Sequence, residues 1–538
     1  MSLTSEPGTP TPAPETPSAL APLRRPVFRM LWATWLIANS CMWMNDVAAA
    51  WLMTSLTTSP AWVAAVQTAS TLPVFLLGLP SGALADILDR RRYFMATQFW
   101  VAAVALLLCV VLMFDGMSAP VLLFLVFLNG VGLALRWPVF SAIVPELVPR
   151  KELPAALALN GVSMNASRII GPLLAGAIIA AAGSLWVFAL NAVMSIIAGI
   201  TVWRWKREAT PPNPLGREPL LSAMRVGLQY VGQSARLRGV LLRIAIFFLH
   251  STALLALLPL VARAMPGGNA GTFTLLLAAM GAGAITAALS MQVLRRHMSS
   301  EALAFRGAAL QAVGSAVMAF SPPIYIGVPV MFLAGAAWIT TANTLTVSAQ
   351  MALPDWVRAR GMSMYQMSIM GASAAGAALW GQVATYTSIQ TSLLVAAFTG
   401  ASLMHVAQRL MPVNDTTMDL TPARPPITHP LPEAVDAGRV VVTVEYLIDP
   451  DRANEFRAVM EESRRVRIGQ GALAWFLLHD TSNPARFIEQ VVDVSWTEHL
   501  RRFDRVTAAD LSLRERRLAF HVGDAPPLIT RYVVDNHD

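Results

Sequence analysis

The sequence predicts an all-α polytopic membrane protein of twelve transmembrane helices in two six-helix halves, followed by a small soluble α+β domain. Three observations lead to this fold class. The 538 residues are 55% hydrophobic and only 13% charged, whereas a soluble protein carries about 25% charged residues. The apolar residues gather into runs of about 20, the length that spans the hydrocarbon layer as a helix. Nearly all arginines fall on alternate connections between these runs, as the positive-inside rule requires.

The spans follow one another with short connections, because lipid offers the backbone no hydrogen-bond partners and each run must satisfy its own as a helix. We expect the first six at 28–53, 61–85, 92–114, 119–143, 155–182 and 184–205. The second six are expected at 239–263, 271–294, 302–321, 324–349, 358–385 and 388–410. The domains are then a disordered tail 1–23, a first bundle 24–205, a middle loop 206–238 and a second bundle 239–411.

Charge sets the orientation. The basic connections carry Arg24, Arg25 and Arg29, then Arg90, Arg91 and Arg92, Arg150 and Lys151, the middle loop, Arg295, Arg296 and Arg306, and finally Arg358 and Arg360. The opposite connections are almost bare, with Asp115 alone in one and Arg263 the one cation. We therefore expect both termini in the cytoplasm and a multi-pass protein of the bacterial inner membrane. The net charge of +8 belongs to this pattern and does not indicate nucleic-acid binding.

The two halves show an internal repeat. Gly161-Val162-Ser163-Met164 in the fifth span matches Gly361-Met362-Ser363-Met364 in the eleventh, and a Pro- and Arg-containing stretch precedes each. Repeated six-span halves with a substrate site between them are a common transporter design. The alternative is that small residues recur because they allow close helix packing in any membrane protein.

After the second bundle the chain changes character. Residues 412–438 are rich in proline and predict an extended linker. Residues 439–538 have a soluble composition, with strands expected at 440–446, 473–479, 487–494 and 528–534, a helix at 449–467, and a helix at 496–520 that is continuous or broken once. The order βαββαβ is the split pattern of ferredoxin-like folds.

Two charges lie deep within spans, Asp46 in the first and Arg168 in the fifth. A charge at that depth costs at least about 2.5–3.5 kcal/mol, so it normally has a partner or faces a cavity. We expect the two to pair, either as a proton-coupling device with Asp46 as the proton carrier or as a static buried ion pair. Arg136, nearer a cytoplasmic helix end, is expected to snorkel to the headgroups.

Other polar residues in the spans are candidates for a central cavity or for simple helix-to-helix hydrogen bonds. We select Asn165, His250 and Gln366 among them. The two cysteines, Cys41 and Cys109, are interpreted as small buried residues. No metal-ligand cluster or nucleophile motif stands out, no cofactor is expected, and the lack of a phosphate-binding loop argues against ATP-driven transport.

The connection after the second span reads Gly82-Ala83-Leu84-Ala85-Asp86-Ile87-Leu88-Asp89-Arg90-Arg91-Arg92. It resembles the signature loop of the major facilitator superfamily of secondary transporters, except that Asp89 replaces a glycine. The resemblance implies a gating role for Gly82, Asp86, Asp89, Arg90 and Arg91. Topological anchoring alone is the alternative.

The fifth span contains Gly171-Pro172 and Gly176. It resembles the Gly-Pro-x-x-x-Gly element of drug antiporters, which implies a role in helix packing. With the stretches at 51–60, 142–149 and 354–362, residues 24–410 resemble the group of major facilitators that includes the enterobactin exporter, the transmembrane secretion effectors. This implies proton antiport that exports a small amphipathic molecule such as a siderophore, drug or metabolite.

The soluble domain is similar to the antibiotic-biosynthesis monooxygenases, on strand order and on Ser495-Trp496-Thr497-Glu498-His499-Leu500. Domains of that family dimerise through their sheet, which implies a regulatory or homodimerising module. His499 is interpreted as an exposed residue at a helix start, with a functional role as the alternative. A second hypothesis for the whole chain therefore remains: a membrane-tethered enzyme or ligand sensor that acts through this domain.

Overall fold

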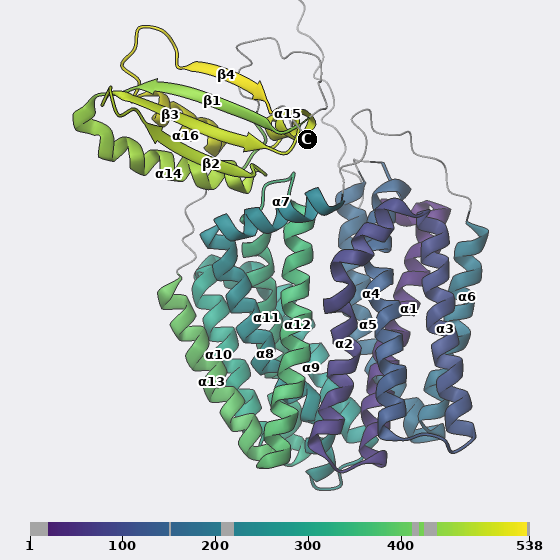
Figure 1. Ribbon diagram of the computed structural model, residues 1–538. Coiled ribbons are helices and arrows are strands. Elements are labelled where there is room, and N and C mark those ends of the chain that lie inside the picture. Colours follow the sequence, from purple (N-terminus) through teal and green to yellow (C-terminus); the bar gives the residue numbers. More distant parts are fainter. Residues whose placement is uncertain (1–19, 150–151, 206–219, 412–418, 424–437, 535–538) are drawn as a thin grey trace, which may run out of the picture.

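The computed structural model describes residues 20–149, 152–205, 220–411, 419–423 and 438–534. Long helices form a single bundle, and the soluble C-terminal domain, here called the tail, stands at one end of it (Figure 1). We call that end of the bundle the tail end and the opposite end the far end. The N-terminal half contains α1 (Pro26–Leu56), α2 (Pro60–Ile87), α3 (Arg90–Met113), α4 (Ala119–Leu147), α5 (Leu153–Ala182) and α6 (Ser184–Arg204). The C-terminal half contains α8 (Ala235–Ala264), α9 (Ala270–His297), α10 (Ser300–Met318), α11 (Ile324–Met351), α12 (Arg358–Tyr386) and α13 (Ile389–Leu410).

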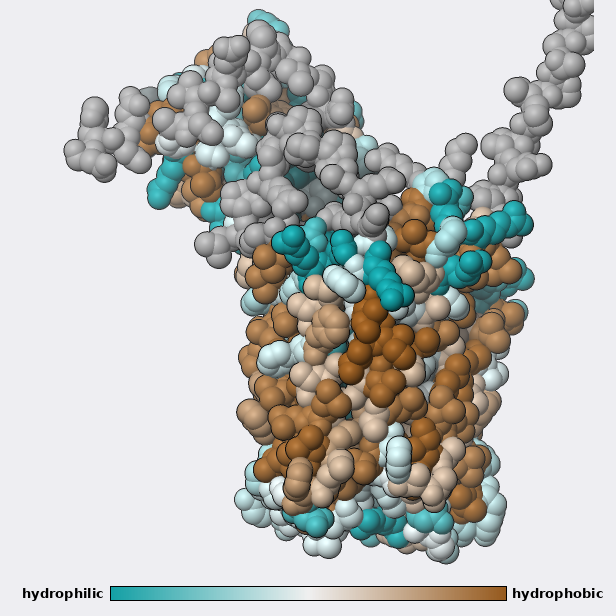
Figure 2. All heavy atoms as spheres, turned by 90° about the vertical axis from the view of Figure 1, so that its right-hand side faces the viewer, coloured by the Kyte–Doolittle hydropathy of each residue, from teal (hydrophilic) through white to brown (hydrophobic). Residues whose placement is uncertain are grey.

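These twelve helices confirm the predicted spans to within a few residues. Within the described residues, nine of them contain a stretch long and apolar enough to cross a membrane by length and composition, and α1, α10 and α12 lie in the same bundle. Figure 2 shows an apolar band along the side of the bundle, with hydrophilic residues gathered at its two ends. The surface thus matches a bilayer, with an apolar middle and polar rims.

Local signals in the sequence place the helix starts. Asn269 and Thr272 form a reciprocal capping box before α9, and the hydroxyls of Ser299 and Ser388 accept backbone N–H groups at the starts of α10 and α13. Such caps satisfy amide groups that have no partner inside the helix. The connections can therefore be short without leaving backbone donors unpaired.

The two halves meet along two helix pairs, α2 with α12 and α5 with α9. At the far end they share one buried core, which includes Met53 and Val63 from the N-terminal half and Leu257 and Trp380 from the C-terminal half. At the tail end the core divides. The cluster around Trp35 draws only on the N-terminal half, and a separate cluster contains C-terminal residues and residues of the middle segment. The halves therefore share one core at the far end and keep separate cores toward the tail end, where α2 and α12 still touch at Gly78 and Met367.

The segment between the halves contains a helix that the sequence analysis did not predict, α7 (Leu220–Gln233). It lies across the tail end of the C-terminal half, beneath the tail (Figure 1). The rest of the middle loop, 206–219, lies outside the described residues, as do residues 1–19 of the N-terminal segment and most of the linker.

The tail confirms the predicted βαββαβ order, with the break in the second helix. Its elements are β1 (Val440–Leu447), α14 (Ala453–Gly469), β2 (Ala474–His479), β3 (Arg486–Asp493), α15 (Trp496–Phe503), α16 (Ala508–Leu518) and β4 (Leu528–Val533). The antiparallel sheet has the order β2-β3-β1-β4. Alternate residues of β1 and β3 are buried, and Tyr446 and Phe487 pack against Phe456 and Met460 of α14.

Candidate transport site

One side of α1 carries the residues from which the site is built. These residues recur at spacings of three, four, seven and eight, so they form one stripe along the helix. The stripe consists of Trp35, Asn39, Met42, Trp43 and Asp46. Two arginines from neighbouring helices stack on this stripe, one on each tryptophan.

Arg168 reaches the stripe from α5, midway along the bundle. Its guanidinium carbon lies 5.5 Å from the ring centre of Trp43 and 4.8 Å from that of Trp338 in α11. The Nε atom is buried without a hydrogen-bond partner. Because α5 and α11 belong to different halves, this arginine joins the halves through aromatic faces near the membrane centre.

The predicted pair of Asp46 with Arg168 is not formed in this conformation. Among the described residues no hydrogen bond or ion pair reaches the carboxylate of Asp46, which is partly exposed. The indoles of Trp43 and Trp338 take the place of the carboxylate as partners of Arg168. Sequence reasoning found both charges but not these aromatic partners, which come from another helix and another half.

Arg136 does not snorkel, contrary to the expectation. Its side chain is only 3% exposed, stacks 5.3 Å from the ring centre of Trp35, and directs Nη2 toward Asn39 Oδ1 at 3.5 Å. A third buried arginine, Arg243 in α8, has ordinary partners: Glu301 at 3.2 Å and the carbonyl of Met411 at 2.7 Å. Within the described part of the chain, Arg136 and Arg168 are thus deep cations held by indoles and without a carboxylate.

The whole sequence matches a known family. The model of the transmembrane secretion effectors, a family of major facilitator transporters, matches residues 17–538. This chain belongs to that family. The multidrug efflux pump Tap of Mycolicibacterium fortuitum is 26% identical, over 69% of this chain and 92% of that protein. The enterobactin exporter EntS of Salmonella typhimurium is 23% identical, over 69% of this chain and 89% of that protein.

Solved structures agree on the fold of the bundle. The nucleoside transporter NupG superposes with a TM-score of 0.59 at 12% identity, over 71% of this chain and 99% of that one. A bacterial homologue of the lysosomal transporter Spinster gives 0.55 at 14% identity, over 72% and 98%. The protein is therefore a multi-pass membrane transporter of the major facilitator type, which agrees with the non-enzymatic function expected for the bundle.

In this secretion effector the two halves are joined at the far end by a contact that the sequence analysis did not predict, here called the latch. Arg263, at the end of α8, donates to the carbonyl of Thr54 in α1 at 2.5 Å and stacks 5.0 Å from the ring centre of Trp51. Trp51 in turn stacks on Phe273 of α9. The signal was present in the sequence, because Arg263 is the one cation on its face of the membrane.

The signature loop forms the tail-end turn between α2 and α3. Asp89 caps α3 by accepting the backbone N–H of Arg92 at 2.9 Å, and Arg91 donates to the carbonyls of Val202 and Trp203 in α6. Arg90 lies in the first turn of α3. Gly82 and Asp86 belong to the last turns of α2, and the side chain of Asp86 is not among those described.

Gly171 and Gly176 of α5 lie where another helix approaches closely. A Cβ added at Gly171 would come within 2.5 Å of Cβ of Trp43, and one at Gly176 within 2.2 Å of the hydroxyl of Thr274 in α9. Pro172 lies inside α5, between them. The second contact joins the two halves, since α9 belongs to the C-terminal half.

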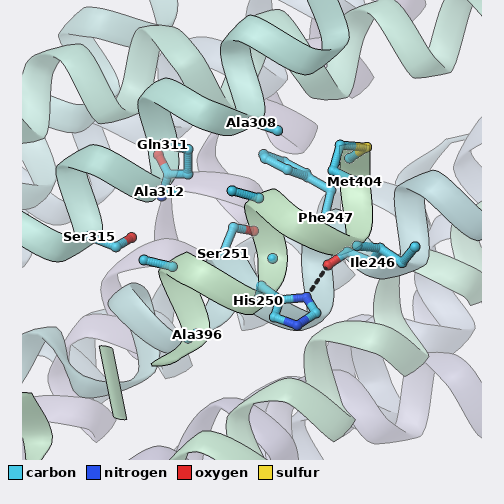
Figure 3. A pocket seen from close by; sticks show the side chains of 13 residues that line it. Ile246, Phe247, His250, Ser251, Ala308, Gln311, Ala312, Ser315, Ala396 and Met404 are labelled. Atoms are coloured by element: carbon cyan, nitrogen blue, oxygen red, sulfur yellow. Dashed lines mark hydrogen bonds between the residues drawn. The ribbon is translucent and has the colours of Figure 1, made fainter. Parts of the chain in front are cut away.

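Of the remaining predicted cavity residues, His250 lies away from Asp46 and Arg168. His250 lies between α8, α10 and α13, where Nδ1 is 2.7 Å from the carbonyl of Ile246; Figure 3 shows it beside Gln311 and Ser251 at a small cavity. Gln366 is partly buried in α12, and the side chain of Asn165 lies outside the described ones.

The tail contains a buried polar network. Glu489 is fully buried and contacts Arg517, Arg467 and the indole of Trp475. Burial would raise the pKa of this carboxyl, but the two arginines outweigh it and hold the pKa at about 2. The domain is thus stabilised by a carboxylate that is ionised under all ordinary conditions.

His499 is buried, not exposed as the sequence was interpreted. It is 2% exposed, and its Nδ1 lies 2.8 Å from Asp493, while Nε2 is buried without a hydrogen-bond partner. Burial lowers the pKa of His499, and the nearby Arg502 lowers it further against the opposing effect of Asp493. The carboxylate of Asp493 thus orients a buried imidazole.

Proposed function

We propose that this transporter exports a small amphipathic molecule, such as a siderophore, drug or metabolite, across the inner membrane by alternating access. The relatives named as an efflux pump and an exporter support the direction. The core that is shared at the far end and divided at the tail end supports alternating access, because the halves are joined more extensively at one end than at the other. This divided core carries the proposal.

The tail end faces the cytoplasm in this proposal. The arginine-rich connections, such as Arg90 to Arg92, belong to that end, whereas the far end carries Arg263. Positive residues favour the cytoplasmic side of a membrane protein. Both termini are then cytoplasmic, and the proposal assigns this arrangement to the cytoplasm-open state of the carrier.

Proton antiport would use Asp46 and Arg168. In the cytoplasm-open state Arg168 stacks on Trp338 of the other half and Asp46 is unpaired. Rocking of the halves moves Trp338 away and leaves Arg168 free to pair with the ionised Asp46. A proton from outside then neutralises Asp46, weakens the pair and favours the return to the cytoplasm-open state, where Asp46 releases the proton to the cytoplasm and is ionised again.

The test compares small molecules inside and outside cells that express the wild-type chain, Asp46→Asn or, as a matched control, Asp115→Asn. Asp115 lies in a far-end connection, outside the site. We expect a compound that accumulates in the medium with the wild type and the control but stays inside with Asp46→Asn. Undiminished pH-dependent export by Asp46→Asn would refute the role of Asp46 as proton carrier. If the medium of cells with the wild-type chain contained the same small molecules as that of cells without the protein, export itself would be contradicted.

The buried dyad of His499 with Asp493 favours a second candidate, a membrane-tethered enzyme or ligand sensor. Ending the chain after residue 411 separates the two, because an exporter keeps its basal transport while a tethered enzyme loses its activity. We also propose that the tail forms homodimers through its open sheet face, where Phe476, Leu528 and Tyr532 are 50%, 65% and 54% exposed. Phe476→Glu should then halve the mass of the purified full chain in light scattering, and an unchanged mass would refute the dimer.

A further inference from the structure

The tail contacts the bundle through the corner where α14 meets β2. The side chain of Gln229 in α7 donates to the carbonyl of Ala472 at 3.1 Å. A Cβ built at Gly469, the last residue of α14, would lie 3.8 Å from Cβ of Gln233 and 3.9 Å from Cα of Tyr230. The backbone of the tail thus lies directly on α7.

Glycine at position 471 makes this approach possible. Gly471 has a φ of +112°, which residues with a side chain rarely adopt, and a Cβ there would lie 2.9 Å from Cγ2 of Val226 in α7. A side chain at this position would both strain the turn and push the tail away from α7.

A second contact reaches past α7 to the bundle itself. The guanidinium of Arg505 is held inside the tail by the carbonyl of Gln470 at 2.6 Å and by Glu498 at 3.0 Å. From there it lies 5.6 Å from the ring centre of Trp356, in the connection between α11 and α12. Because its internal partners fix its position, Arg505 presents a preformed cation to an aromatic face.

α7 is in turn fixed to the same connection. The hydroxyl of Tyr230 donates to the carbonyl of Ala352 at 3.0 Å, and its ring meets Trp356 edge-on at 5.6 Å. Gly227 lets α7 approach α12, since a Cβ there would lie 3.0 Å from Cε of Met364. One turn further along α12, Met367 lies 3.1 Å from the Cβ position of Gly78 in α2.

We propose that the tail is docked and not merely tethered: α7 and Trp356 form its docking surface, and through them it restrains the tail end of α12 against α2. α12 and α2 form the main seam between the halves. Within the described residues, the extensive packing of α7 is with the tail, α8 and α12, not with the N-terminal half. The tail therefore moves with the C-terminal half, and any event that displaces it acts on the seam.

Docking can be tested by a disulfide in the full chain. The Cβ separation of 3.8 Å between positions 233 and 469 lies in the range of 3.5–4.5 Å found in disulfides. The native Cys41 and Cys109 are buried, so the pair Gln233→Cys with Gly469→Cys reports alone. The control pairs Gln233→Cys with Arg457→Cys, about 18 Å further along α14. We expect a disulfide to form rapidly in the first pair only. Equal yields of disulfide in the two pairs, or no disulfide in the first pair, would overturn docking.

The restraint on the seam is measured separately. Met367→Cys is labelled with N-ethylmaleimide in membranes, alone and combined with Arg505→Ala, Trp356→Leu or, as a control, Arg516→Ala. Arg516 pairs with Glu462 on the exposed side of the tail. We expect about fivefold faster labelling with Arg505→Ala and Trp356→Leu, the lower limit of ordinary coupling between sites. Unchanged rates, or the same increase with Arg516→Ala, would overturn the restraint.

Discussion

Removing the guanidinium of Arg263 should open the far end of the carrier. Arg263 belongs to α8, and both of its partners, Thr54 and Trp51, belong to α1 in the other half. These contacts exist only while the far ends of the halves are together. Arg263→Met keeps most of the aliphatic stem but removes the donor and the charge, so the change acts mainly on the closed state.

The size of the effect follows from the two contacts. A hydrogen bond from a charged donor contributes about 1.5–3 kcal/mol, and an exposed cation–π contact about 0.5–1 kcal/mol. Because the side chain of Arg263 is exposed and water competes for it, we take about 1–2 kcal/mol for both. This corresponds to about 5- to 30-fold in the equilibrium. A far-end-open form populated at about 1% would rise to about 5–25%.

The measurement is a distance distribution between spin labels at Ser55 and Pro266, exposed residues at the far end of the two halves. The native cysteines are buried and should not take the label. We expect a longer distance to appear with Arg263→Met. Arg295→Met, an exposed arginine at the tail end of α9, should leave the distribution unchanged. An unchanged distribution with Arg263→Met would refute the latch.

Two further predictions concern packing and the tail. Gly176→Ala should destabilise the folded transporter by about 1–3 kcal/mol, because the added methyl group meets Thr274 of the other half. The control Gly161→Ala should leave the stability unchanged, because nothing lies within 4 Å of the Cβ position at Gly161. Equal melting temperatures of the two variants would contradict this prediction. Glu489→Gln should destabilise the tail by about 3–5 kcal/mol, since it leaves the buried Arg517 and the partly buried Arg467 without their carboxylate. The pKa of Glu489 is held at about 2 in the folded tail, against about 4.3 in the unfolded chain. The ionised carboxylate should therefore add its full share to the free energy of unfolding above about pH 4.3, and this share should disappear as the pH falls from about 4.3 through about 2. The same acid dependence of unfolding in the wild type and in Glu489→Gln would contradict the network.

The fold could be predicted because it depends on the length of the apolar runs and on the period at which apolar residues recur. Apolar runs of about 20 residues locate the spans whatever packs against them, and the alternating pattern of the tail gives its strand order. α7 was missed because Leu220–Gln233 is only 14 residues long and lies among prolines and arginines of the middle loop. Its helical identity is visible only when its neighbours in the tail and at the tail end of the bundle are known.

Of the candidate site, only the charged residues could be predicted from the sequence. Asp46 and Arg168 stand out because charge is rare in a span, but their partners are set by tertiary contacts. Arg136 is compatible with snorkelling from its position near a helix end, and only the packing of α4 on α1 turns it inward. His499 follows a helix-capping serine and looks exposed, yet Asp493 on the adjacent strand draws it into the interior.

The contrast between the deep arginines explains why indoles suit a transport site. Arg243 is held by Glu301, and breaking a buried ion pair costs about 3–5 kcal/mol, which fits a fixed structural contact. Arg168 is held by two indoles, and a desolvated cation–π contact contributes about 2 kcal/mol. A cation that exchanges partners in every cycle needs partners that release it at low cost. In the cycle proposed above, Trp338, the partner of Arg168 on the opposite half, leaves when the halves rock, so the same motion that would expose the site to the other side would free Arg168 for the ionised Asp46.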